Sequence, residues 1–122
     1  MRCLIIDDSP DFLAAASRLL QQEGLIVVGT ASSGDEAVRL ARELRPDVTL
    51  VDIELGAEDG IAVARRLAAS DGQPAGKLIL ISTHEEDEFA DLIQASPAIG
   101  FVAKSALSAQ AIYSLTGGEP VS

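Results

Sequence analysis

The sequence of 122 residues contains one cysteine, one tyrosine, three phenylalanines and no tryptophan. A single cysteine, Cys3, excludes a disulfide within the chain and favours a reducing compartment. Because Cys3 lies in an apolar run, we expect a buried strand residue there rather than a reactive thiol. The scarcity of aromatic residues, beside abundant Ala, Leu, Ile and Val, suits a sheet wrapped by helices better than an antiparallel sandwich.

The sequence also lacks long hydrophobic runs and an excess of positive charge. No apolar stretch is long enough to span a bilayer, and no signal peptide is visible, so we expect no membrane insertion. The formal net charge of −10 makes direct binding to nucleic acid or to an anionic membrane surface unfavourable. The acidity fits a cation site, a basic partner, or solubility alone. We therefore expect a cytoplasmic protein with one core, which an apolar fraction of 48% can supply.

Five short apolar runs alternate with five segments of helical periodicity. The runs are rich in β-branched residues and apolar on both faces, which is typical of strands in a parallel sheet covered on both sides. They span residues 3–6, 25–28, 48–51, 78–81 and 99–103. The helical segments carry apolar residues three or four positions apart: Phe12, Ala16, Leu19 and Leu20; Ala37, Leu40, Ala41 and Leu44; Ile61, Ala64 and Ala68; Phe89, Leu92 and Ile93; Leu107, Ala111, Ile112 and Leu115.

This alternation predicts an α/β, doubly wound (βα)5 domain over residues 1–116, with a flexible tail at 117–122. The common strand order at this size is 2-1-3-4-5, with a switch point between the first and third strands. Ser9 and Asp59 are expected N-caps, Pro10 suits the first helical position, and Gly24 suits the end of the first helix.

Acidic residues follow two of these strands. Asp7 and Asp8 come directly after the first run, and Asp52 follows the third. Parallel strand ends converge at one edge of a sheet, so the three carboxylates would repel one another unless a hard cation joined them. This pattern indicates a Mg²⁺ site and phosphoryl transfer. Taken singly, each of these acids is as well explained by helix capping or a turn.

Two further polar residues complete the set, because Ser82 follows the fourth run and Lys104 the fifth. Lys104 is one of only two lysines, and its ordinary role would be a surface side chain. With the acids, these residues resemble the site of response-regulator receiver domains, the CheY-like phospho-acceptor domains of two-component signalling. The spacing from Asp52 to Asp59 and Gly60 also matches that family, and the resemblance covers essentially the whole chain.

The resemblance implies a flavodoxin-like fold and a role for each residue of the site. Asp52 would accept a phosphoryl group from a histidine kinase or a phosphotransfer protein. Mg²⁺ would be held by Asp8, Asp52 and the backbone carbonyl of Glu54, while Asp7 orients a metal water or a neighbouring ligand. Lys104 would pair with Asp52 at rest and with the phosphoryl group afterwards.

The resemblance further implies a switch. The hydroxyl of Ser82 would move toward the phosphoryl group and Phe101 would rotate inward, changing the face formed by the fourth helix, fifth strand and fifth helix. That face would bind a downstream protein or a second copy. Glu54 and His84 would flank the phosphoryl group and tune its hydrolysis. On its own, His84 reads as an exposed loop residue beside the acidic run at 85–88.

The sequence departs from the common family pattern at three positions. Ser82 stands where many members have Thr, and Gly56 where Pro is common, which predicts a looser loop. Ser105 replaces a Pro after the lysine, which excludes the cis-Pro bond that many members have there.

The sequence is compatible with several functions. The leading expectation is a stand-alone receiver that is no enzyme beyond its own phosphorylation and dephosphorylation. The alternatives are the receiver half of a transcription factor with a helix-turn-helix output domain, and a phosphorylation-independent interaction module. A hydrolase of the haloacid dehalogenase type also uses an aspartyl nucleophile. Such enzymes keep it on the first strand, two residues before a second Asp, whereas the acids here are adjacent.

Overall fold

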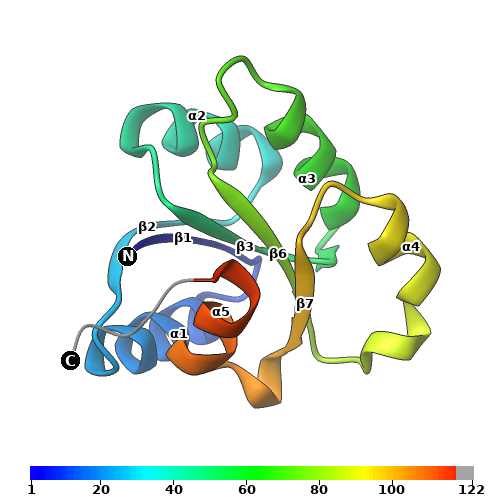
Figure 1. Cartoon of the computed structure of the whole chain (residues 1–122). Coiled ribbons are helices and arrows are strands. Elements are labelled where there is room, and N and C mark those ends of the chain that lie inside the picture. The colour runs from blue at the N-terminus through cyan, green and yellow to red at the C-terminus, as the bar shows by residue number, and fades with distance from the viewer. Residues whose placement is uncertain (118–122) are drawn as a thin grey trace.

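The computed structural model describes residues 1–117 as helices packed on both faces of a parallel sheet (Figure 1). The sheet has five strands in the order β2-β1-β3-β6-β7, and every neighbouring pair is parallel. The expected (βα)5 order 2-1-3-4-5 is confirmed, because β6 and β7 are the fourth and fifth strands of this sheet. The strands are β1 (Arg2–Ile6), β2 (Ile26–Ala31), β3 (Val48–Asp52), β6 (Lys77–Ser82) and β7 (Gly100–Ala103). The tail expected at 117–122 lies, after Gly117, outside the described residues.

Five helices cover the sheet (Figure 1). On one face lie α1 (Pro10–Gln22) and α5 (Ala109–Thr116), and on the other lie α2 (Gly34–Leu44), α3 (Gly60–Ala69) and α4 (Ala90–Ala95). Because successive strand residues point to opposite faces, the buried side chains form two cores: Ile5 packs with α1 and α5, whereas Leu4 packs with α2 and α3. The polar residues at the strand ends are thus held by a frame packed from both sides.

The predicted helix starts are confirmed. Ser9 accepts a hydrogen bond from the Phe12 N–H at the start of α1, and Asp59 accepts one from the Ile61 N–H at the start of α3. Gly24, with a φ of 97°, follows the end of α1. Cys3 is fully buried in β1, as expected. Among residues 1–117, no helix combines the length and apolar character that a membrane crossing requires.

Two local expectations are wrong, and one short element was not predicted. The strand β2 is not buried on both faces, because it lies at the sheet edge and leaves Ile26 58% exposed. Leu92 does not share the buried face of α4 with Ile93, since it is 51% exposed. The segment after β3 forms a short antiparallel hairpin, β4 (Glu54–Leu55) and β5 (Glu58–Asp59), rather than an open loop.

Candidate functional site

The three aspartates predicted to cluster lie together at the carboxyl-terminal edge of the sheet. Asp7 and Asp8 follow β1, and Asp52 ends β3, which is the neighbour of β1. One carboxylate oxygen from each lies within 4.8 Å of the other two. Asp7 is fully buried and Asp52 is 4% exposed, whereas Asp8 is open to solvent. Two buried carboxylates at this distance need compensating positive charge.

Hydrogen bonds hold both the backbone and the side chain of Asp7 in place. Its N–H donates to the Ala31 carbonyl at 3.0 Å, and its Oδ1 accepts the Ser9 N–H at 2.8 Å. Its Oδ2 is buried and lies 2.5 Å from Nζ of Lys104 in an ion pair. The helix cap at Ser9 therefore also aims Asp7 into the site.

Lys104 reaches the acids from the end of β7. Its Nζ donates to Oδ2 of Asp52 at 3.1 Å, and it lies 4.4 Å from the centre of the Phe12 ring, where a cation–π contact forms. Burial alone would lower the pKa of Lys104, but hydrogen bonds and ion pairs to Asp7 and Asp52 outweigh it and hold the pKa above its ordinary value. The ammonium is therefore charged throughout the physiological range.

Burial raises the pKa of Asp52 to about 6, although hydrogen bonds from Lys104 and from the Glu54 N–H oppose the rise. The Glu54 N–H donates to Oδ1 of Asp52 at 3.0 Å. At neutral pH the Asp52 side chain is thus mainly a carboxylate, which is the form a nucleophile requires.

Glycines allow the backbone to pass close to these acids. A methyl group on Gly60 would overlap the backbone carbonyl oxygen of Asp52, so only glycine fits there. Gly56 has a φ of 60°, and a methyl group on it would lie 3.1 Å from Oδ2 of Asp8. Gly56 therefore brings the hairpin that was missed by sequence reasoning close to Asp8, while Gly60, at the start of α3, lies against Asp52.

Ser82, Glu54 and His84 form a second group beside the acids. Ser82, at the end of β6, is 1% exposed, and its Oγ accepts the His84 N–H at 3.0 Å. Nδ1 of His84 lies 2.8 Å from Oε1 of Glu54 and 3.4 Å from Oγ of Ser82, and its ring meets Phe89 edge-on at 5.8 Å. Within residues 1–117, the Ser82 hydroxyl has no hydrogen bond to Asp52. His84 is half-exposed, yet it bridges the hairpin after β3 and the end of β6.

Phe101 does not reach into this group. It lies half-buried on β7, paired in register with Leu80 of β6, two positions before the pair formed by Ser82 and Ala103. The sequence could not predict the contacts of Ser9 and Phe12 with the site, because a helix cap and an apolar helix position look the same whether or not they serve it.

The residues present fit a hard divalent cation. Carboxylate oxygens from Asp7, Asp8 and Asp52 are the ligand type that Mg²⁺ prefers. Oδ2 of Asp7 pairs with Lys104, so the ammonium and a cation would share the negative charge of the cluster.

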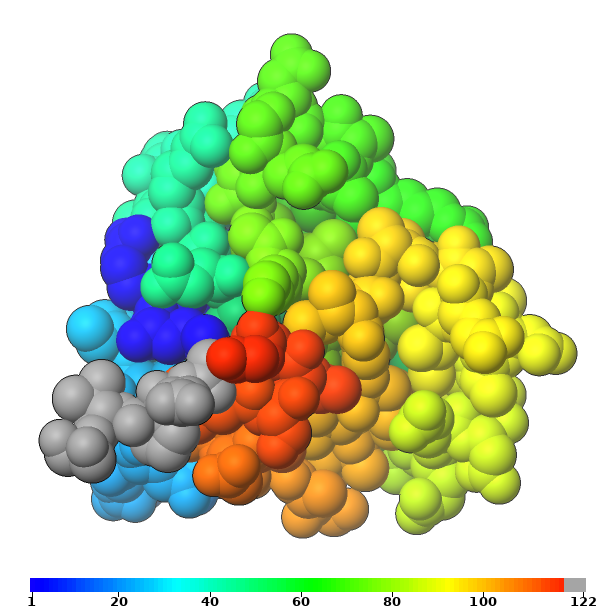
Figure 2. Space-filling model, viewed as in Figure 1, coloured from blue at the N-terminus to red at the C-terminus, as the bar shows by residue number. Residues whose placement is uncertain are grey.

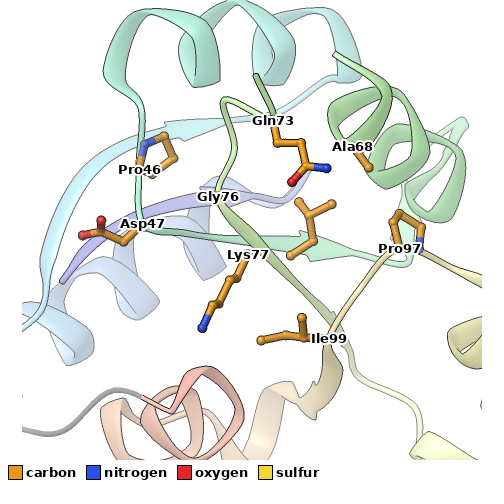
Figure 3. Close-up of a pocket in the computed structure, with 9 residues that line it drawn as sticks. Pro46, Asp47, Ala68, Gln73, Gly76, Lys77, Pro97 and Ile99 are labelled. Carbon is orange, nitrogen blue, oxygen red and sulfur yellow. The ribbon is translucent and has the colours of Figure 1, made fainter. Parts of the chain in front are cut away.

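A hollow lies away from these acids, at the opposite edge of the sheet (Figure 3). It has a volume of about 480 Å³ and an open, mixed lining that includes Pro46, Gln73, Leu78, Pro97 and Ile99. Lys77 reaches past it and donates to the Thr116 carbonyl at 2.6 Å, which ties β6 to the end of α5. Its lining contains none of the predicted site residues.

Comparison with known proteins agrees with this geometry. The profile of the response regulator receiver domain family matches residues 3–115. The chain is 36% identical over 107 residues to the response regulator GacA of Pseudomonas aeruginosa, covering 87% of this chain and 49% of that protein. It is 38% identical over 127 residues to protein-glutamate methylesterase/protein-glutamine glutaminase 5 of Myxococcus xanthus, covering 99% of this chain and 35% of that protein.

Solved structures give the same result. The signal receiver domain of the putative response regulator NarL from Mycobacterium tuberculosis superposes with a TM-score of 0.82 at 29% identity, covering 97% of both chains. The chain spans about half the length of the GacA proteins that it matches.

Proposed function

The chain belongs to the response regulator receiver domain family, and from that premise we propose that Asp52 accepts a phosphoryl group from the phosphohistidine of a kinase or phosphotransfer protein. One observation carries the proposal. Asp52 is a buried carboxylate at a strand end, hydrogen-bonded to Lys104 at 3.1 Å and flanked by the carboxylates of Asp7 and Asp8. A structural carboxylate would not need two acidic neighbours, because they raise the cost of its charge.

The transfer is a displacement at phosphorus. An oxygen of Asp52 forms the new P–O bond, the P–N bond to the donor imidazole breaks, and the imidazole nitrogen keeps that electron pair. Since the pKa of Asp52 is about 6, the side chain is ionised and able to attack at pH 7. Lys104, already within 3.1 Å of Oδ2, would follow the new negative charge onto the phosphoryl oxygens.

The residues that would hold Mg²⁺ are Asp8, Asp52 and the backbone carbonyl of Glu54, with Asp7 orienting a ligand water. When bound, Mg²⁺ supplies positive charge that offsets the charge on the phosphoryl oxygens. Asp8 suits the role of the solvent-facing ligand, because it is the exposed member of the cluster.

Ser82 and Phe101 would convert the modification into a change of surface. In the structure the Ser82 oxygen accepts the His84 N–H and lies 3.4 Å from Nδ1 of His84, so a turn of the hydroxyl would direct its proton to a phosphoryl oxygen. Movement of Ser82 toward Asp52 would leave room at the end of β6 for Phe101 of β7 to turn inward. The face formed by α4, β7 and α5 would then present a different surface to a downstream protein or a second copy.

Glu54 and His84 would tune how long the phosphoryl group survives. Their side chains meet at 2.8 Å, joining the hairpin to the segment after β6. We propose that this pair restricts the approach of an attacking water, so that it acts on hydrolysis more than on phosphoryl transfer.

We propose that the receiver works in the cytoplasm as a single-domain regulator that turns over no external substrate. The second candidate is the receiver part of a longer regulator with a helix-turn-helix output domain, which the greater length of the GacA proteins favours. The mass of the native protein in cell extracts would distinguish a single-domain regulator from a longer one.

The experiment that tests the proposal is intact mass spectrometry after incubation with acetyl phosphate. We expect one phosphoryl adduct that requires Mg²⁺, survives acid, is lost in base, and is absent from Asp52→Asn. The matched control is Asp71→Asn, an exposed acid after α3, which should be modified like the native chain. An unmodified native chain that also binds no Mg²⁺ would instead favour a phosphorylation-independent interaction module.

A further inference from the structure

A hydrogen bond ties the hairpin after β3 to α2. Oε1 of Glu58, on β5, accepts the N–H of Gly34, the first residue of α2, at 2.9 Å. The hairpin pairs only two residues of β4 with two of β5, and a ladder this short does not hold its position alone. The place of the hairpin beside the acids therefore depends on the contacts that its side chains make with the rest of the fold.

These contacts hold the hairpin on two sides. Glu54, on β4, pairs with His84 after β6 at 2.8 Å, whereas Glu58, on β5, reaches α2. The hairpin leads from β3 into α3, and the surfaces of α2 and α3 lie on either side of residues 70–76 in Figure 2. The bond from Glu58 thus connects two helices of one face of the sheet close to the point where the acids gather.

The Glu58 carboxylate lies closely against the start of α2. A methyl group on Gly34 would lie 2.7 Å from Oε2 of Glu58 and 2.9 Å from Nη1 of Arg66, so a glycine leaves the room that the carboxylate occupies. The first N–H groups of a helix carry partial positive charge, which favours a carboxylate there. The bond is therefore charge-assisted, and such bonds are stronger than those between neutral groups.

The start of α2 also has a cap of its own. Oγ of Ser33 accepts the Glu36 N–H at 3.2 Å, and Oε1 of Glu36 accepts the Ser32 N–H at 2.9 Å. This local cap can begin the helix without Glu58, which comes from 24 positions away from Gly34. The larger effect of the bond should therefore fall on the hairpin.

We propose that Glu58 is a positioning residue of the cation site, which holds the backbone carbonyl of Glu54 where it can bind Mg²⁺. Asp59, the residue after Glu58, pairs in register with Glu54, so a shift at Glu58 passes across the ladder to that carbonyl. The same shift would reach Asp8, because a methyl group on Gly56 of the hairpin would lie 3.1 Å from Oδ2 of Asp8. The inference rests on the proposed function, since it concerns the cation that phosphoryl transfer would use.

Cation affinity tests the positioning directly. Mn²⁺, which shares the preference of Mg²⁺ for oxygen ligands, is titrated by electron paramagnetic resonance, and Mg²⁺ by its displacement of Mn²⁺. Without the bond, in Glu58→Ala, the Glu54 carbonyl occupies the ligand position for a smaller fraction of the time, and the apparent affinity falls by that fraction. We expect both cations to bind about fivefold more weakly, which is the effect of one hydrogen bond of about 1 kcal/mol.

Two matched variants separate the hydrogen bond from the charge. Glu58→Gln removes the charge but keeps an oxygen that can accept the Gly34 N–H. Asp35→Asn removes one charge from the first turn of α2, where Asp35 pairs with Arg66. Each should weaken cation binding by less than about twofold, because the lost charge is exposed and screened. Hydrogen exchange without a cation should become faster in Glu58→Ala over residues 53–60 and stay unchanged in β3 and β6.

Native affinity in Glu58→Ala would overturn the proposal. A loss in Glu58→Gln or Asp35→Asn as large as that in Glu58→Ala would also overturn it, because charge alone would then explain the effect. Faster exchange throughout the chain would do the same, since Glu58 would then serve global stability. A native chain that binds neither cation contradicts the proposed function and the positioning together, whereas a native chain that binds them as well as Glu58→Ala does contradicts the positioning alone.

Discussion

Replacing Asp52, the proposed phosphoryl acceptor, should make the metal-free protein more stable. Asp52→Asn removes a carboxylate whose pKa is raised to about 6, chiefly by burial, from an ordinary value of 3.8. The folded state therefore binds the proton of Asp52 more tightly than the unfolded state does. Such a group favours folding fully only below its unfolded pKa, and stability falls as pH rises through the range between the two values. Asparagine resembles the protonated form of Asp52, so the variant does not lose this stability as the pH rises.

The magnitude follows from the two pKa values. Linkage gives a destabilisation by the ionised side chain of about 3 kcal/mol at pH 7 and about 1 kcal/mol at pH 4.5. Lys104 remains paired in Asp52→Asn, because it keeps its ion pair with Asp7 at 2.5 Å. We therefore expect Asp52→Asn to gain about 1–3 kcal/mol in the free energy of unfolding at pH 7.

Urea unfolding in the presence of a chelator measures this gain. At a slope of about 1.5 kcal/mol per molar urea, the midpoint should rise by about 1–2 M at pH 7, and the gap should shrink at pH 4.5. Asp71→Asn controls for the loss of one surface charge and should leave the midpoint nearly unchanged. The reasoning is refuted if Asp52→Asn is no more stable than the native chain at pH 7, or if the gap is as large at pH 4.5. Added Mg²⁺ should narrow the gap, because the native carboxylate then gains a ligand.

Other perturbations follow from the same contacts. Lys104→Met leaves two buried carboxylates unpaired, so the free energy of unfolding at pH 7 should fall by about 3–5 kcal/mol, and urea unfolding at lower pH should recover part of it. Gly60→Ala forces a methyl group into the backbone carbonyl of Asp52, so thermal unfolding monitored by circular dichroism should shift to a much lower temperature. Glu54→Ala, His84→Ala and the double variant should change the lifetime of the phosphoryl adduct by the same factor, because the two side chains act as one pair; multiplied effects would contradict this. Burial raises the pKa of the Cys3 thiol to about 12, so iodoacetamide should label the native protein at pH 8 only when it unfolds.

The parts of the fold that follow from periodicity could be predicted. Runs such as residues 48–51 and 78–81 are apolar on both faces, and the structure buries them in the central strands β3 and β6. The meeting of Asp7 and Asp52 was predictable for the same reason, since two adjacent parallel strands must end at one edge. Helix caps at Ser9 and Asp59 were readable because the capping bond is local in sequence.

The features that depend on tertiary contacts could not be read in this way. The exposure of Ile26 depends on β2 being an edge strand, which its own sequence does not encode. The hairpin at β4 and β5 has too few residues to show any alternation. The contact between Glu54 and His84 joins positions thirty residues apart, and the cation–π contact of Lys104 with Phe12 joins two ends of the chain.

If Asp52 is phosphorylated as proposed, the charge of the site predicts that cation binding and phosphorylation act on each other. Three carboxylates face one ammonium, and Lys104 is already shared between Asp7 and Asp52. A phosphoryl group carries roughly −1.5 to −2 in an ordinary phosphoester, so modification of Asp52 replaces one negative charge with more. Lys104 carries a single positive charge, and the carboxylate of the buried Asp7 cannot become hydrated unless the fold opens. We therefore expect the adduct to raise the affinity of the site for a divalent cation. By linkage, the cation must favour formation of the adduct by the same factor, so a measurement of either effect fixes the coupling factor for both.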